Sequence, residues 1–311
     1  IYQCDWSSDV CSSDLSDRLK LLVCLLTVLF AVIYIPAHAE NSTIRVFTSI
    51  LPQKYFVEKI AGDLVEVEVL VGPGMSPHTF EPLPQQMSRL SRAAVFFMIG
   101  IPFEQALIQR LAAVCPDLKF VDTGKNVARR SMKEQESDHQ HSEDCVHEVG
   151  TPDPHIWLDP AHAVTIAAAI ASGLIEIMPD KAARLEEGLQ KLTAELTAVD
   201  EELAASLKPL KGQTILVFHP AFGYFAARYG LKQQSVEIEG KEPGPRQLAE
   251  LIRQCRQLGI RVVFVQKQFP VAAAETIARS INGAVVSIDP LAEDYIANLN
   301  RLGEAILAGA K

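Results

Sequence analysis

The sequence lacks an excess of basic residues. Its 311 residues include 29 lysines and arginines against 38 aspartates and glutamates, a formal net charge of -9, and no basic cluster stands out along the chain. A protein that binds nucleic acid needs a positive surface to neutralise phosphates, so we do not expect nucleic acid as a partner. An acidic surface is instead compatible with cations.

The sequence also lacks paired-cysteine motifs. Of the six cysteines, three lie in N-terminal segments that we exclude from the mature fold, namely Cys4, Cys11 and Cys24. The other three are Cys115, Cys145 and Cys255, an odd number without CxxC spacing. At most one intramolecular disulfide can form among them, and neither a cysteine-ligated metal site nor a dithiol redox motif is predicted.

The N-terminal 39 residues are not expected to belong to the mature fold. Residues 1–15 contain the near repeat SSDVC and SSDL, which resembles translated sequencing-adapter sequence, and we treat them as a non-native segment. In residues 16–39, Arg18 and Lys20 precede an apolar run, and a small-x-small pattern follows at 37–39. This order predicts a cleaved signal peptide and export to the periplasm. The apolar run of about 15 residues is shorter than the ~20 that span a bilayer, which disfavours the alternative of an uncleaved anchor.

The mature chain alternates β-rich runs with helical patterns. Runs rich in valine, isoleucine and phenylalanine lie at 45–50, 65–71, 94–99, 118–121, 214–218, 235–238, 262–265 and 284–288. Helical patterns lie between them at 54–61, 84–91, 103–114, 222–229, 246–258, 271–281 and 295–307. Apolar strands separated by helices are typical of parallel sheets covered on both faces. We therefore predict an α/β protein with two similar lobes, 40–179 and 208–311, each on a parallel sheet of about four strands.

A single long helix is predicted between the lobes, at residues 180–207. Its apolar residues recur at intervals of three and four, which places them on one stripe. They are Leu185, Leu189, Leu192, Leu196, Val199, Leu203 and Leu207. At ~1.5 Å per residue the helix would be roughly 40 Å long and could touch both lobes. The alternative use of such a stripe is a coiled-coil seam for dimerisation; we expect a monomer with a rigid connecting helix.

One segment has almost no apolar residues to bury. Residues 133–148 are rich in carboxylates and also contain His139, His141, Cys145 and His147. This composition predicts a flexible surface loop within the first lobe. The loop is either a solvated acidic linker or a weak metal-gathering segment, because histidine, carboxylate and thiol are ligands that borderline divalent metals favour.

Four side chains with ligand chemistry occupy proline-flanked positions near predicted strand ends. They are His78, His155, His219 and Asp289. Neighbouring prolines restrict the backbone, which suits a rigid ligand. Ligands of parallel α/β sheets bind beyond the carboxyl ends of the strands, and each lobe contributes two of these residues. We therefore predict a metal site in the cleft between the lobes. Three imidazoles and one carboxylate suit near-tetrahedral zinc, whereas manganese usually takes more oxygen ligands.

Five motifs together resemble the zinc/manganese solute-binding proteins of ABC uptake systems. In chain order they are PHTFEP (77–82), DPHIWLDP (153–160), FHPAFGYF (218–225), EGKEP (239–243) and DPL (289–291). The resemblance extends over residues 44–308. It implies two lobes joined by one rigid helix, and metal held by His78, His155, His219 and Asp289. It also implies that Zn(II) is a transported ligand, delivered to an inner-membrane ABC permease.

Details of the motifs bear on the metal. Histidine at 219 resembles the zinc-importing branch of that family, since the manganese branch tends to carry glutamate there; a receptor for Mn(II) is the alternative. A histidine-rich acidic loop is also typical of the zinc branch, although here it is short. Gln266 stands where many zinc receptors carry glutamate, which puts in doubt any accessory ligand or partner contact at that position.

Two other classes of function are compatible with an exported metal-binding chain. One is a secreted zinc hydrolase, in which three of the four residues bind metal and Glu81 or Asp159 acts as base. Four protein ligands would fill the coordination shell, whereas a catalytic zinc keeps one position open, so we predict a receptor and not an enzyme. Glu81 or Asp159 could also orient an imidazole. The other class is a surface adhesin, for which the sequence offers no specific feature.

Overall fold

The computed structural model describes residues 43–132, 152–238 and 240–310. The two predicted N-terminal segments, 1–15 and 16–39, lie outside these residues. The predicted loop at 133–148, with His139, His141 and His147, lies outside them as well. From Thr43 onward the chain forms a single compact unit.

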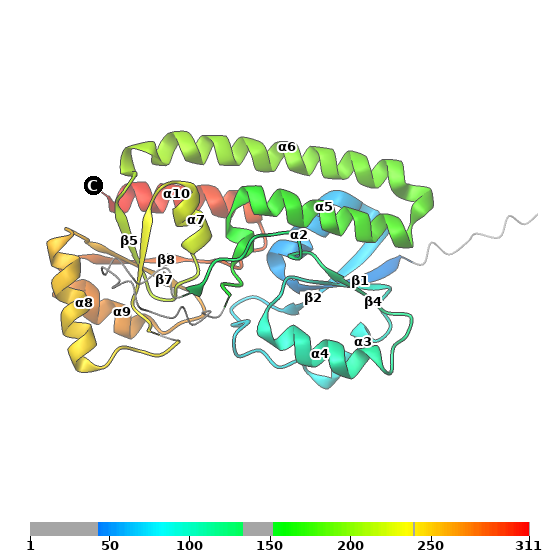
Figure 1. Cartoon of the computed structure of the whole chain (residues 1–311), viewed down its shortest axis with the longest axis horizontal. Coiled ribbons are helices and arrows are strands. Elements are labelled where there is room, and N and C mark those ends of the chain that lie inside the picture. Colours follow the sequence, from blue (N-terminus) through cyan, green and yellow to red (C-terminus); the bar gives the residue numbers. More distant parts are fainter. Residues whose placement is uncertain (1–42, 133–151, 239, 311) are drawn as a thin grey trace, which may run out of the picture. The chain divides into compact units, whose positions relative to one another are not determined.

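The first lobe is built on a four-stranded parallel sheet (Figure 1). In spatial order its strands are β2 (Val65–Val71), β1 (Ile44–Ile50), β3 (Val95–Met98) and β4 (Lys119–Asp122). Branched and aromatic side chains pack well on a pleated surface, and all four residues of β3 are buried. The connecting helices are α2 (Leu51–Ala61), α3 (Pro84–Leu90) and α4 (Pro102–Ala112). Each has proline in its first turn, where the missing N–H has no helical partner to lose.

The second lobe repeats this arrangement. Its strands, in spatial order, are β6 (Lys232–Ser235), β5 (Thr214–Val217), β7 (Val262–Gln266) and β8 (Ala284–Ile288), all parallel. Its helices are α7 (Gly223–Arg228), α8 (Pro245–Gln257), α9 (Val271–Ser280) and α10 (Tyr295–Gly309). In both lobes the strand that comes first in the chain lies second in the sheet, between the two strands that follow it in sequence. The prediction of two similar parallel-sheet lobes is confirmed.

One predicted strand is wrong in position. The apolar pattern at 235–238 suggested the second strand of this lobe, but β6 is the polar run Lys232–Ser235. An edge strand is covered by a neighbour on one side only, so its sequence need not be apolar. The predicted residues lie just beyond the strand, where Val236 and Glu237 are buried.

The long helix α6 (Ala182–Leu207) confirms the predicted connecting helix. Short 3₁₀ turns flank it at Pro179–Lys181 and Lys208–Leu210. It packs on α2 of the first lobe, on α10 of the second and on the preceding helix α5, so its apolar stripe is already covered within the chain (Figure 1). The stripe is therefore not a free seam for a coiled coil. Gly188 permits this packing, since a Cβ there would lie 2.2 Å from the carbonyl oxygen of Ile60.

The sequence pattern did not predict the helix α5 (Pro160–Ile177). Asp159 caps its N-terminus by accepting a hydrogen bond from the amide of Ala161 at 2.8 Å, and Pro160 follows in the first turn. Its length and mean hydropathy of 1.5 would also suit a membrane span. In this fold the helix packs against α6 and α2, with Ile166, Ile170 and Leu174 fully buried in the core.

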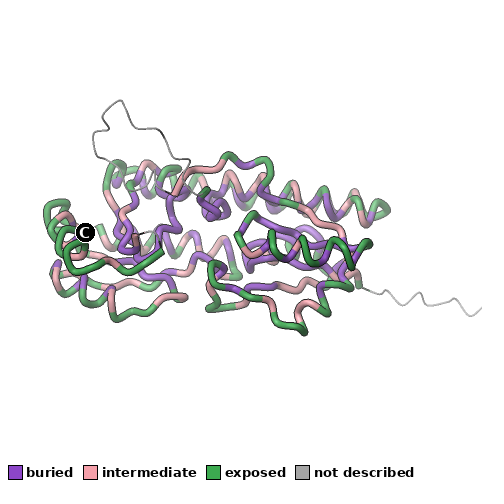
Figure 2. The backbone as a smooth tube through the Cα atoms, turned by 60° about the horizontal axis from the view of Figure 1, so that its bottom comes forward, coloured by how far each residue is buried: buried purple, intermediate pink, exposed green. Residues whose placement is uncertain are grey.

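The two lobes share a continuous hydrophobic core. One cluster of buried side chains extends from β1 and β3 across α5 and α6 to α10, and a second lies between the sheet of the second lobe and helices α8 and α9. Figure 2 shows that buried stretches of the chain gather in the interior and that exposed stretches lie mostly on the outside. The metal site predicted from the sequence lies where this core reaches the carboxyl ends of the strands.

Candidate metal centre

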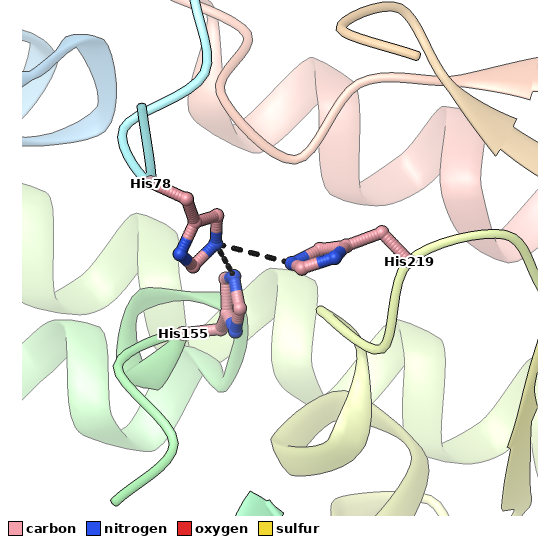
Figure 3. A group of neighbouring side chains, drawn as sticks. All are labelled: His78, His155 and His219. Atoms are coloured by element: carbon pink, nitrogen blue, oxygen red, sulfur yellow. Dashed lines mark hydrogen bonds between the residues drawn. The ribbon is translucent and has the colours of Figure 1, made fainter. Parts of the chain in front are cut away.

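Three of the four predicted ligands converge on one point. His78, His155 and His219 each offer a ring nitrogen, and these nitrogens all lie within 4.8 Å of one another (Figure 3). The first two come from the first lobe and the third from the second. Because they lie 77 and 64 residues apart in sequence, only the assembled fold can bring them together. It is the only such group of histidine, cysteine and carboxylate side chains in the part of the chain that the structure describes.

His155 is held by a buried carboxylate. It directly precedes the 3₁₀ turn Ile156–Leu158 and is 2% exposed. Oδ1 of Asp153 accepts from the backbone N–H of His155 at 3.0 Å and lies 2.7 Å from its Nδ1. A carboxylate oxygen accepts hydrogen bonds and does not donate them, so Nδ1 of His155 carries a hydrogen. The other nitrogen, Nε2, is left with a lone pair directed towards His78.

His219 has the same arrangement in the second lobe. It follows β5 by two residues, and its Nδ1 lies 2.6 Å from Oε2 of the buried Glu237. The hydrogen again resides on Nδ1, and Nε2 is left to bind. The side chain of Phe269 lies parallel to the imidazole, with ring centroids 5.0 Å apart and 18° between the planes. Carboxylates that orient metal-binding histidines in this way also increase the basicity of the ring.

His78 completes the group from the loop between β2 and α3. Its Nε2 lies 3.2 Å from Nε2 of His155 and 3.1 Å from Nε2 of His219. A neutral imidazole nitrogen donates at most one hydrogen, so Nε2 of His78 can make a full hydrogen bond to only one of the two rings, and the other close contact between nitrogen atoms is left without one. A cation between the three nitrogens would instead be coordinated by all of them. The arrangement is therefore that of a ligand set, and not of a hydrogen-bonded core.

The environment keeps the imidazoles of His78 and His219 unprotonated. Loss of solvent around the ring and the approach of His155 and His219 lower the pKa of His78 to about 3. Burial lowers the pKa of His219, against the opposing effect of Glu237. Both rings are neutral at pH 7, which is the form that binds metal.

Asp289 lies outside the group of three. It follows β8 directly, as predicted, but its carboxylate is engaged elsewhere. Oδ1 accepts from the Gln268 side chain at 3.1 Å and from the amide of Leu291 at 3.0 Å, and Oδ2 lies 3.6 Å from Nζ of Lys267. The neighbouring Pro290 and Leu291 do line the cavity that contains the three histidines. A ligand role for Asp289 stays a prediction.

The orienting carboxylates are residues that the sequence pattern did not single out. Asp153 lies against Nδ1 of His155 and Glu237 against Nδ1 of His219. The sequence instead suggested Glu81 or Asp159 for this role. Asp159 caps α5 and lies 3.3 Å from Arg228, while Glu81 is exposed. Asp153 could have been found from its place two residues before His155. Glu237 carried a weaker signal, a lone carboxylate between the apolar Val236 and Ile238.

Comparison with known proteins gives this geometry a family context. A sequence model of the family described as ZnuA, zinc-uptake complex component A, periplasmic, matches residues 46–309. The zinc-binding lipoprotein AdcA of Streptococcus pneumoniae serotype 4 is 29% identical over 282 residues, which cover 88% of this chain and 55% of that protein. The high-affinity zinc uptake system protein ZnuA of Yersinia pestis is 29% identical over 267 residues, covering 81% of this chain and 84% of that protein.

A solved structure shares the fold. A crystal structure of ZnuA matches with a TM-score of 0.79 and 36% sequence identity, covering 87% of this chain and 100% of that chain. The chain spans about half the length of the AdcA relatives that it matches. The two lobes and their connecting helix are thus shared with a protein whose whole chain is covered.

Proposed function

Because this chain belongs to the ZnuA family of periplasmic zinc-uptake components, we propose that it captures Zn(II) in the periplasm and delivers it to an ABC permease for import. The observation that carries the proposal is the convergence of three imidazoles on one point. Zinc bonds of about 2.0 to 2.1 Å in tetrahedral geometry place neighbouring ligand nitrogens about 3.3 Å apart. The Nε2 contacts of His78, at 3.1 and 3.2 Å, come close to that spacing.

The chemistry of the donors favours zinc over manganese. Imidazole is a borderline ligand that suits zinc, whereas manganese prefers carboxylate, carbonyl and water oxygens. All three converging donors are nitrogen atoms. We propose Asp289 as a fourth donor, which would require its carboxylate to leave Gln268. The proposed ligand set is then His78, His155, His219 and Asp289.

The proposed role is that of a receptor and not of an enzyme. Four protein ligands leave no open position on a tetrahedral zinc, and an open position is what a catalytic zinc needs. Two further carboxylates near the site, those of Asp153 and Glu237, each accept from an imidazole, so neither is placed as a base for a metal-bound water. Release to the permease must instead weaken a filled coordination shell.

Export and domain organisation complete the proposal. The predicted signal peptide at 16–39 fits a periplasmic receptor, while some relatives are named as lipoproteins.

We assign 40–179 to the first lobe, 180–207 to the connecting helix and 208–311 to the second lobe, and expect the mature chain to act as a monomer. His139, His141 and His147 of the predicted loop are proposed as weak accessory metal contacts.

Competition calorimetry with Zn(II) and Mn(II) on the mature chain tests this function. We expect one tight zinc site per chain, and zinc should displace manganese when both are present in equal amounts. Tight binding of manganese that zinc does not displace would overturn the metal assignment. If neither ion bound tightly, the receptor role itself would be refuted.

A further inference from the structure

The segment that follows β7 lies between the two proposed donors of the second lobe. In the sheet, β7 is flanked by β5, which leads to His219, and by β8, which leads to Asp289. The register pairs Gln266 with Ile288, the residue before Asp289. Residues 266–269 therefore run between the two donors at the edge of the sheet where the metal site forms.

Gln266 fixes the backbone of His219 at two points. Its Oε1 accepts from the N–H of His219 at 3.1 Å, and its Nε2 donates to the carbonyl oxygen of the same residue at 2.6 Å. The side chain is fully buried and lines the cavity with the three histidines. A primary amide is the side chain that supplies one donor and one acceptor in this geometry, whereas an ionised carboxylate can only accept.

Phe269 fixes the orientation of the His219 ring. Its amide N–H donates to the carbonyl oxygen of Gln266 at 3.0 Å, which folds the segment back over the site. Its ring then stacks on the imidazole, as described above. The backbone and the ring of the same donor are thus held by one four-residue stretch.

Gln268 holds the other donor. Its Nε2 donates to Oδ1 of Asp289 at 3.1 Å. Its Oε1 is buried without a hydrogen-bond partner among the described residues, although the side chain lines the same cavity. A buried amide oxygen without a partner is unfavourable in a purely structural position. The hydrogen bond to Asp289 and the place in the cavity lining therefore connect this side chain to the site.

We propose that residues 266–269 are the positioning element of the metal site, with Gln266 and Phe269 fixing His219 and Gln268 fixing Asp289. This inference rests on the proposed function, because it assumes that His219 binds the ion. It assigns a role to Gln266 that does not require contact with metal. It also couples the two donors of the second lobe through one short segment.

The first test replaces Gln266 by methionine, which keeps the side-chain length and removes both hydrogen bonds. A matched control is Gln53→Met, since Gln53 is also fully buried and uses both ends of its amide, accepting from Ser49 N–H at 3.1 Å and donating to Oγ1 of Thr123 at 3.0 Å. None of these partners belongs to the metal site. Zinc affinity is measured by competition with a chelating dye, and the ligand field by the visible absorption of the Co(II)-loaded protein.

We expect Gln266→Met to weaken zinc binding about 10- to 100-fold, as is usual when the partner of a metal ligand is removed. The Co(II) absorption bands should change in shape. Gln53→Met should lower the melting temperature and leave both readouts unchanged. If Gln266→Met lost thermal stability but kept its zinc affinity and Co(II) spectrum, the positioning role would be refuted while the receptor role stood. An unaltered chain without tight zinc binding would refute both.

The second test concerns Gln268 and remains available if Gln266→Met does not fold. Gln268→Met is measured in the unaltered chain and in a chain carrying Asp289→Ala. We expect a loss of zinc affinity of about tenfold in the first background and no further loss in the second, because the side chain acts through Asp289. An equal loss in the two backgrounds, or no loss in either, would overturn the proposal for Gln268.

Discussion

The indole nitrogen of Trp157 donates a hydrogen bond to the carbonyl oxygen of Pro290 at 2.8 Å. In return, the hydroxyl of Tyr295 donates to the carbonyl oxygen of Trp157 at 2.6 Å. Both aromatic side chains are almost completely buried. The first bond ties the segment that carries His155 to the segment that carries Asp289, one from each lobe. The lobes are thus joined beside the three histidines.

Loss of this contact should destabilise the whole protein. We expect Trp157→Phe to lower the free energy of unfolding by about 1 to 3 kcal/mol, because it leaves the Pro290 carbonyl without a buried donor and adds unfilled space. Tyr295→Phe removes one hydroxyl without altering the packing and should cost about 1 kcal/mol. Urea denaturation of the metal-free proteins measures both. A Trp157→Phe protein as stable as the unaltered chain would show that the contact does not join the lobes.

Removal of one donor should abolish tight binding. Loss of a residue that only holds a metal ligand weakens metal binding roughly 10- to 100-fold. His219→Ala removes a proposed ligand itself, so we expect it to weaken zinc binding by more than that. The matched control is His162→Ala, because His162 lies on α5 at 3.9 Å from Asp159 and does not belong to the group of three. Calorimetric titration distinguishes the two. Equal affinities for His219→Ala and the unaltered chain would remove His219 from the ligand set.

The orienting carboxylates should matter for affinity more than for stability. Asp153→Asn and Glu237→Gln keep the shape of the side chain and remove the charge that each imidazole N–H faces. We expect each to weaken zinc binding about 10- to 100-fold. Asp159→Asn is the control, since asparagine also caps helices and Asp159 contacts no ligand imidazole. If Asp159→Asn weakened zinc binding as much as the other two variants, the carboxylates would have no specific role.

The metal-free protein should become less stable as the pH falls below neutrality. The pKa of His78 is about 3 in the fold against an ordinary value of 6.5. The unfolded chain therefore takes up a proton that the folded chain does not, and stability present above pH 6.5 is lost as the pH falls towards 3. Burial lowers the pKa of His219 and adds to the effect in the same direction.

Urea denaturation at pH 7.5 and pH 5, with a chelator present, measures this loss. His78→Gln removes one of the titrating rings. The urea concentration at the midpoint of unfolding should therefore fall less from pH 7.5 to pH 5 in this variant than in the unaltered chain. A fall of the same size in His78→Gln would show that the site does not hold His78 unprotonated.

The sequence singled out the three histidines that converge, but not the residues that hold them. Proline-flanked histidines at strand ends are a local pattern, and three of them meet as expected. Asp153 and Glu237 are recognised only once the fold places each beside an imidazole. The proposed role of Gln266 depends on the pairing of β7 with β5, which no local sequence pattern encodes.

The same distinction applies to the fold. The long helix α6 was predictable because its apolar residues form a single stripe along a polar helix. Helix α5 was not, since the helix is covered by the sheet and by other helices and its sequence is apolar on most faces. In such a run the small and apolar residues of the buried face are not set off by polar residues on the other faces, so the pattern does not stand out as amphipathic. Its one local signal was Asp159 followed by Pro160, a capping residue and a proline in the first turn.

X-ray absorption spectroscopy of the zinc-loaded mature chain tests the central claim most directly. We predict four nitrogen or oxygen neighbours at about 2.0 to 2.1 Å, with scattering from three imidazole rings. Three imidazoles and a water molecule would still support the histidine site but remove Asp289 from it. Fewer than three imidazoles, or any sulfur neighbour, would contradict the proposal that His78, His155 and His219 hold the transported zinc.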